Sequence, residues 1–120
     1  MRVLHVVDSH QFRGAEMFAA DLIRALRESG VSQRVAVLRE HEGRGVSYGA
    51  PNHTFGSDGF TIPGLRIRPR ALLALRALIS RWRPDFVQAH GGDTLKYTIP
   101  AAITRRTSVV YRKIGPTPRD

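Results

Sequence analysis

Residues that could bind a ligand or carry a proton stand at two points of the sequence, each directly after a short apolar run. The first point is the turn that ends in Gly14, Ala15 and Glu16, and the second is His90 with Gly91. Glycine lets a ligand approach the backbone closely, and histidine can hydrogen-bond a hydroxyl group or carry a proton. These residue types predict a site for a phosphate or a hydroxyl group, with His90 as the catalytic candidate.

The same residues also have simpler structural explanations, which stay open at this point. In the structural explanation, Gly14 and Ala15 only form a tight turn between a strand and a helix and bind nothing. Glu16 is favourable in a first helical turn because the helix dipole stabilises an acid there. His90 can be a polar residue that merely ends a strand.

Three further polar residues are expected near these turns. Asp93 either contributes to the binding site or serves as the N-cap of a helix that begins at Thr94. Arg112 and Lys113 end the last predicted strand, at the same sheet edge as the two glycine-containing turns. Two cations at that place suit a phosphate or a carboxylate, or they simply mark an exposed strand end.

Several common kinds of site are excluded by their missing motifs. There is no GxGxxG for a nicotinamide or flavin cofactor, no GxxxxGK[ST] phosphate loop and no GxSxG nucleophile turn. The five histidines show no HxH or HExxH spacing, and the chain has no cysteine, so we expect neither a metal site nor a cofactor. His5, inside the first predicted strand, is interpreted as a hydrogen-bonded core residue.

The elements that must position these residues follow from apolar spacing and from glycine and proline. The predicted elements are a strand at 3–7, a helix from Ala15 that Gly30 ends, strands at 33–39 and 53–55, a helix at 69–82, a strand at 85–89, a helix at 94–106 and a strand at 108–112. Pro100 is expected to kink or split the last helix. This order predicts an α/β, Rossmann-like three-layer sandwich with a mostly parallel sheet, in which ligands bind beyond the carboxyl ends of the strands.

Composition indicates one domain, residues 1–120, with a net charge of +9. No apolar stretch resembles a signal peptide or approaches the ~20 residues of a membrane span, so we expect a cytoplasmic location. The charge has three interpretations: a solvated basic surface, which we favour, attraction to an anionic membrane or acidic ligand, and nucleic-acid binding. Basic and aromatic residues do not alternate as in base-stacking proteins, so no nucleic acid is expected.

The predicted helix at 69–82 combines apolar and basic residues. One apolar face is expected to hold Leu72, Leu75, Ile79 and Trp82, broadened by Leu73 and Leu78. The basic residues in and just after this helix are Arg70, Arg76, Arg81 and Arg83. A helix of this composition can lie on an anionic membrane surface.

Three segments together resemble the N-terminal half of glycosyltransferase family 4, whose members have the GT-B fold. These segments are RVLHVVDSHQFRGAEMFAADLIRALRESG, QRVAVLR and RPDFVQAHGGD, and the likeness covers residues 1–39 and 82–114 but not 40–68. The family typically opens with a strand, a glycine-rich turn ending in Gly-Ala-Glu and a long helix. Arg13 stands where the family usually has a second glycine.

The resemblance implies a retaining enzyme that transfers a sugar from a nucleotide-sugar donor without a tightly held metal. By this likeness, Gly14 and Ala15 lie near the donor pyrophosphate and His90 contacts the transferring sugar. The implied partners are the nucleotide-sugar donor, a sugar or lipid-linked acceptor, and an anionic membrane. The implied location is peripheral, at the inner face of that membrane.

The resemblance also implies that the second, C-terminal nucleotide-sugar-binding domain is missing from these 120 residues. We therefore expect a truncated chain that is inactive alone and that self-associates through its exposed interdomain face. The alternative from another functional class is a non-catalytic α/β module that binds a nucleotide or an anionic partner.

Overall fold

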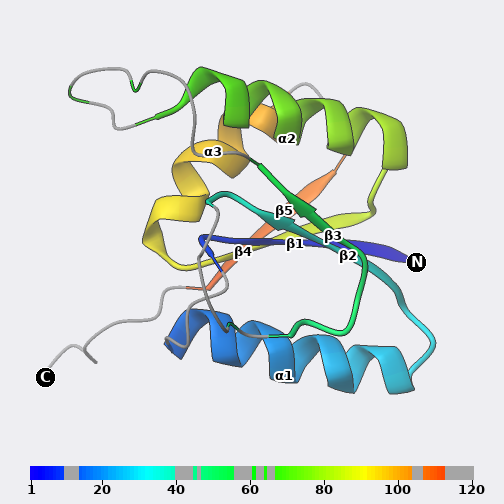
Figure 1. Ribbon diagram of the computed structural model, residues 1–120. Helices are drawn as coiled ribbons and strands as arrows, with labels where there is room; N and C mark the ends of the chain where they lie inside the picture. Colours follow the sequence, from blue (N-terminus) through cyan, green and yellow to red (C-terminus); the bar gives the residue numbers. More distant parts are fainter. Residues whose placement is uncertain are drawn as a thin grey trace, which may run out of the picture.

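A computed structural model describes residues 1–9, 14–39, 45, 47–55, 61, 64, 67–103 and 107–112. The elements are β1 (Arg2–Val7), α1 (Gly14–Glu28), β2 (Ser32–Val37), β3 (Asn52–Thr54), α2 (Pro69–Trp82), β4 (Phe86–His90), α3 (Gly92–Ala102) and β5 (Ser108–Arg112). The five strands form one parallel sheet in the order β3-β2-β1-β4-β5. Helix α1 covers one face of the sheet, and α2 and α3 cover the other (Figure 1). The predicted fold class is confirmed.

Most element boundaries differ by one or two residues from those that the sequence predicts, and the differences at β4 and α3 bear on the site. Strand β4 ends at His90 itself, so this histidine belongs to the sheet. Helix α3 begins at Gly92, two residues earlier than expected, and ends at Ala102. Pro100 lies inside this helix, which ends two residues later, so of the two expected effects the split is wrong and the kink stays a prediction.

The ends of α1 and α2 are fixed by local backbone chemistry. After α1, the Gly30 N–H donates to the Arg27 carbonyl (3.0 Å) and the Val31 N–H to the Leu26 carbonyl (3.3 Å). With Gly30 at a φ of 77°, this is a Schellman ending. Helix α2 begins at Pro69, as predicted, because the fixed φ of proline suits a first helical position.

The apolar stripes of the helices and the alternation of the strands produce two core layers. The buried residues between the sheet and α2 with α3 include Leu4, Val6, Leu75, Leu78, Ile79 and Val87. Those between the sheet and α1 include Val7, Ala19, Ile23, Val35 and Val37. The prediction that Leu73 joins the apolar face of α2 is wrong: its side chain is 64% exposed, because two residues along a helix is about 200° of rotation from buried Leu75.

Opposite the carboxyl ends of the strands, a group of side chains ties β1 to the turn before β4. The backbone N–H of Arg2 donates to Asp85 Oδ2 (2.8 Å), and the Arg2 side chain donates to the Trp82 carbonyl. The guanidinium groups of Arg2 and Arg34 lie 5.9 and 5.1 Å from the centre of the Trp82 ring, within cation–π range. Trp82 is therefore a structural contact at the amino edge of the sheet.

Candidate functional site

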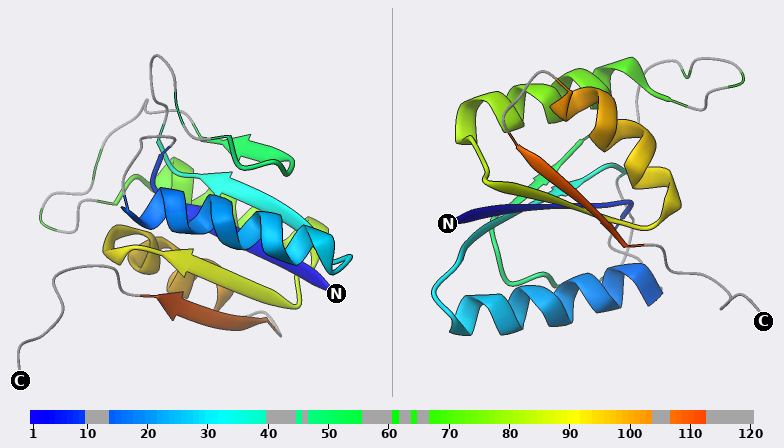
Figure 2. Two further views of the ribbon diagram at one scale, coloured as in Figure 1. Left: turned by 90° about the horizontal axis from the view of Figure 1, so that it is seen from below. Right: turned by 180° about the vertical axis from the view of Figure 1, so that it is seen from behind.

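The two glycine-containing turns predicted to bind a ligand lie against each other at the carboxyl edge of the sheet. Gly91, between β4 and α3, has φ 99° and ψ 159°, a backbone conformation essentially restricted to glycine. A Cβ atom built on Gly91 would lie 3.5 Å from the Cβ of Ala15, in the first turn of α1. The start of α1 and the turn after β4 thus lie side by side (Figure 2).

The remaining predicted residues fall around this contact. Gly14 opens α1 and is exposed, whereas Glu16 is 1% exposed in the first turn of that helix. Arg112 ends β5 and pairs in register with His90. Lys113 lies outside the described residues.

The interpretation of Asp93 as the N-cap of a helix beginning at Thr94 is wrong. The N-cap position is occupied by Gly91, and Asp93 lies inside the first turn of α3. The hydroxyl of Thr94 donates to the Gly91 carbonyl (2.7 Å), which adds a side-chain bond to this turn. With Gly91 at the N-cap in this glycine-specific conformation, the helix begins at Gly92 and not at Thr94.

His90 is the end of a buried chain of polar side chains under α1. Its Nε2 lies 3.0 Å from Nδ1 of His5, and Nε2 of His5 lies 2.8 Å from Oε1 of Gln33. Nε2 of Gln33 donates to the Ile23 carbonyl of α1 (2.8 Å). We call these three side chains the Gln33–His5–His90 series. The prediction that His5 is a hydrogen-bonded core residue is confirmed.

Packing holds the two histidine rings in place. The rings of His5 and His90 are stacked with centroids 5.2 Å apart, and Phe18 of α1 lies 6.1 Å from His90. His5 is fully buried and His90 is 1% exposed. Burial lowers the pKa of His5 below its ordinary value, and the hydrogen bond with Gln33 opposes this only in part. His5 is therefore a neutral ring at neutral pH.

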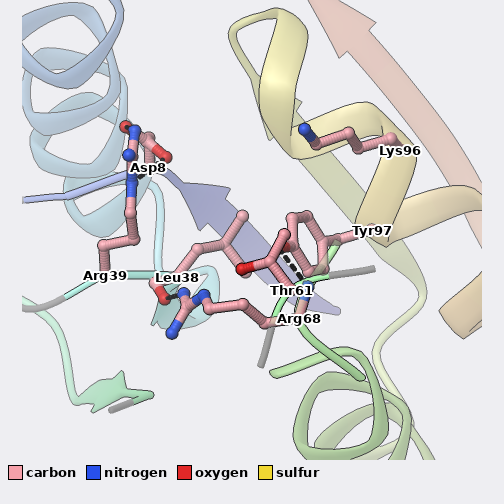
Figure 3. A pocket seen from close by; sticks show the side chains of 7 residues that line it. All are labelled: Asp8, Leu38, Arg39, Thr61, Arg68, Lys96 and Tyr97. Carbon is pink, nitrogen blue, oxygen red and sulfur yellow. Dashed lines mark hydrogen bonds and ion pairs between the residues drawn. The ribbon is translucent and has the colours of Figure 1, made fainter. Parts of the chain in front are cut away.

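A polar cavity of about 270 Å³ also lies at the carboxyl ends of β1 and β2, beside α3 (Figure 3). Its lining residues are Asp8, Leu38, Arg39, Thr61, Arg68, Lys96 and Tyr97. Arg39 donates to both carboxylate oxygens of Asp8, to Oδ1 at 3.0 Å. This bidentate geometry holds the carboxylate and the guanidinium at fixed positions in the cavity wall.

Arg68 joins the other walls of the cavity. Its backbone N–H donates to the Tyr97 hydroxyl of α3 (2.9 Å), and its guanidinium donates to the carbonyl of Leu38 after β2 (Figure 3). The segment that enters α2 is thus anchored to both the sheet and α3. Carboxylate, guanidinium and hydroxyl groups together can hydrogen-bond a ligand rich in hydroxyl groups.

Residues 13–112 match the family described as the glycosyl transferase 4-like domain. The chain belongs to this family. The match includes Gly14, Gln33, His90 and Gly91 but begins after β1, so it does not include His5. No curated protein sequence gives a significant match to the chain.

Two solved structures show that this glycosyl transferase 4-like domain has the fold expected of it. The Anabaena protein Alr3699/HepE, solved in complex with UDP and glucose, is 18% identical with a TM-score of 0.64, over 92% of this chain and 29% of that one. MurG of Acinetobacter baumannii is 16% identical with a TM-score of 0.66, over 93% of this chain and 34% of that one. The chain therefore spans about a third of the length of these proteins.

Reasoning from the sequence of this glycosyl transferase 4-like domain did not identify the residues that line the cavity. Asp8 follows β1 directly and Arg39 lies two residues after β2, and this position at strand ends is the signal that could have found them. Arg68, Lys96 and Tyr97 meet them only through the tertiary packing of α2 and α3, which no local pattern encodes.

Two site classes are not found in the part of the chain that the structure describes. No three His, Asp or Glu side chains in it are grouped so that they could hold a metal ion. None of its helices has the length and apolar character needed to span a bilayer.

Replacing Gly91 by asparagine is expected to lower the free energy of unfolding by about 1–3 kcal/mol, since its φ and ψ are strained for any other residue. Gly30→Asn is the matched control, because asparagine often ends helices in the left-handed conformation that Gly30 adopts. Its loss should stay within about 0.5 kcal/mol. Urea unfolding followed by circular dichroism measures both, and equal losses would contradict this account of the turn.

Stability is expected to fall as the pH drops below about 6.5, the ordinary pKa of histidine. The pKa of buried His5 is lower in the folded protein, so in this range the unfolded chain binds a proton that the folded chain does not. The pKa of His53 is also lowered, by burial and then by the charges of Arg34 and Arg81, and adds the same sign.

Urea unfolding between pH 7.5 and 5.5 measures this slope, which for one proton reaches at most about 1.4 kcal/mol per pH unit. The variant His53→Gln should keep most of it, because His53 is far less buried than His5. A free energy of unfolding that stays constant or rises over this pH range would show that His5 does not titrate as described.

Proposed function

We propose that the chain is the acceptor-side half of a retaining glycosyltransferase that uses a nucleotide-sugar donor. The observation that carries this proposal is the contact of the Gly91 turn with the start of α1, next to His90. It gives a ligand access to backbone at a strand end and a helix N-terminus, which favours phosphate. Membership of the glycosyl transferase 4-like domain family supports the reaction class.

In this proposal the donor lies across the surface that the two turns share. The N–H groups at the start of α1, near Gly14 and Ala15, approach the donor pyrophosphate. Arg112 ends β5 at the same edge, where it pairs in register with His90. The solved HepE structure contains UDP and glucose, which supports a nucleotide sugar as the donor class here.

His90 contacts the transferring sugar in this proposal, and the acceptor occupies the polar cavity near the ends of β1 and β2. The Asp8–Arg39 pair and the Tyr97 side chain offer both donors and acceptors of hydrogen bonds to sugar hydroxyls. In this proposal the reaction needs no tightly held metal, as the family resemblance implies.

The chain alone is proposed to be inactive because it forms only one side of a cleft. It spans 29% and 34% of the two solved structures. Stabilising a transition state requires donors placed around the developing charge, and a single half leaves the other side to water. A second domain that binds the nucleotide would complete the site.

A membrane contact through α2 is part of the same proposal. The residues on its outer face, spaced i, i+3, i+7 and i+11, are Arg70, Leu73, Ala77 and Arg81, and all four are exposed. Exposed arginines around an apolar side chain suit the surface of an anionic bilayer. A cytoplasmic, peripheral protein could reach a lipid-linked acceptor in this way.

The product of the complete natural gene is expected to have a mass of roughly 40 kDa, that of two or three domains, and to hydrolyse or transfer from a nucleotide sugar. His90→Ala should lower kcat/KM by at least about tenfold, the worth of one hydrogen bond to the substrate. The control His53→Ala, on edge strand β3, should leave kcat/KM unchanged. The 120-residue chain should show no turnover.

A natural product of 13.4 kDa would contradict the proposal. It would favour a non-catalytic module that binds a nucleotide or an anionic partner, as would a full-length protein without turnover on any nucleotide sugar. A loss in His53→Ala as large as that in His90→Ala would remove the assignment of His90.

For the membrane contact, the chain should co-sediment with vesicles of anionic phospholipid at low salt and not with neutral vesicles. The double variant Arg70→Gln/Arg81→Gln should weaken this binding by about 1 kcal/mol per arginine. Arg24→Gln, which removes an exposed arginine from α1 on the other side of the sheet, is the control and should bind normally. Equal retention on anionic and neutral vesicles would refute the contact.

A further inference from the structure

The Gln33–His5–His90 series runs across three neighbouring strands, from the middle of α1 to the carboxyl end of β4. Gln33 lies on β2, His5 on β1 and His90 on β4. The side chains that flank Gln33 and His5 on this face, such as Val35 and Val7, are apolar and fully buried. Polar groups in such surroundings are costly unless hydrogen-bonded, so the series needs an explanation beyond packing.

The direction of every hydrogen bond in the series is fixed from one end. The Ile23 carbonyl can only accept, so the amide nitrogen of Gln33 must face it. The amide oxygen of Gln33 therefore faces His5, and an oxygen that only accepts requires a proton on Nε2 of His5.

The same reasoning carries through to His90. A neutral His5 with its proton on Nε2 has a lone pair on Nδ1, so the bond between the two histidines requires a proton on Nε2 of His90. In its uncharged form the ring of His90 then carries its lone pair on Nδ1. One amide on β2 thus determines the tautomer of a histidine two strands away.

We propose that Gln33 and His5 are positioning residues that hold His90 as a hydrogen-bond acceptor through Nδ1. A ring fixed in this way accepts a hydrogen bond from a hydroxyl group. It does not donate one to a phosphate oxygen, which itself only accepts. The group that His90 selects is therefore a hydroxyl group on a sugar carbon. This last step rests on the proposed glycosyl transfer, whereas the tautomers do not.

The tautomers are measurable by long-range ¹H–¹⁵N NMR on the 120-residue chain with labelled histidine. In the wild-type chain, His5 and His90 should both show the pattern of a ring protonated on Nε2. A pattern of Nδ1 protonation at either ring would overturn the proposal. The readout does not depend on any ligand or activity.

The variant Gln33→Glu should reverse the series. A carboxylate in place of the amide stabilises a positive charge on His5. A charged His5 donates from Nδ1 as well, so Nε2 of His90 must become the acceptor and its proton must move to Nδ1. His90 should therefore switch tautomer, although the substitution lies on another strand. An unchanged His90 beside a charged His5 would refute the coupling.

A second variant, Gln33→Met, keeps the length of the side chain but can neither donate nor accept. This variant should leave the direction of the hydrogen bond between His5 and His90 unspecified, so that both rings show a mixture of the two tautomers. His53 is the internal control, because it pairs with Ala36, whose side chain packs on the α2 side of the sheet, and should keep its signals in every variant. A single wild-type tautomer at His90 in Gln33→Met would contradict the proposal.

The product of the complete gene tests the link to catalysis. Gln33→Glu should lower kcat/KM by about tenfold, the worth of one hydrogen bond. Combined with His90→Ala it should cause no further loss, because it acts only through His90. Additive losses would contradict a positioning role. A wild-type protein without turnover would contradict the proposed function alone, since the NMR measurement decides the tautomers separately.

Discussion

The parallel pairing of β1 between β2 and β4 is the constraint on which the remaining structure depends. Because these strands run in the same direction, the residues that follow them meet at one edge of the sheet. Asp8 after β1, Arg39 after β2 and His90 at the end of β4 are far apart in the sequence and neighbours at this edge. Because α1 follows β1 and α3 follows β4, the N-termini of both helices also lie at this edge, on opposite faces of the sheet (Figure 1).

The same pairing explains how polar side chains can be buried in the centre of the sheet. Side chains on paired parallel strands that point to one face lie in rows, so Gln33, His5 and His90 can reach one another across three strands. Each ring nitrogen that joins two of them has a partner with matching polarity. The polar side chains therefore cross the face under α1 diagonally, from Gln33 near the amino end of β2 through His5 in the middle of β1 to His90 at the carboxyl end of β4. The hydrogen bonds of the Gln33–His5–His90 series run in a single direction, because the series starts at a carbonyl of helix α1.

Most of the fold could be predicted from the sequence because its signals are local. Period-3.6 and continuous apolar runs located the helices and strands, and Pro69 and Gly30 marked helix ends. The predictions that failed concern Leu73, Asp93 and Pro100, where rotation about a helix or one unusual glycine decides the outcome. The sequence placed His90 and the two turns at one edge, but the hydrogen bonds from His90 to His5 and Gln33 depend on strand register, which no local pattern encodes.

The two edges of the sheet carry different physical tasks. At the amino edge, Arg2 closes the start of β1 through a hydrogen bond from its backbone N–H to Asp85 and a contact with the Trp82 ring, which are stabilising interactions. Toward the carboxyl edge, Gly91 has a conformation that only glycine tolerates, and the buried series that contains His5, whose pKa burial lowers, ends there at His90. Strain and buried polar groups concentrate where a ligand must be recognised, and they persist because packing elsewhere offsets their cost. This distribution is the physical reason to place the function of the domain at the carboxyl edge.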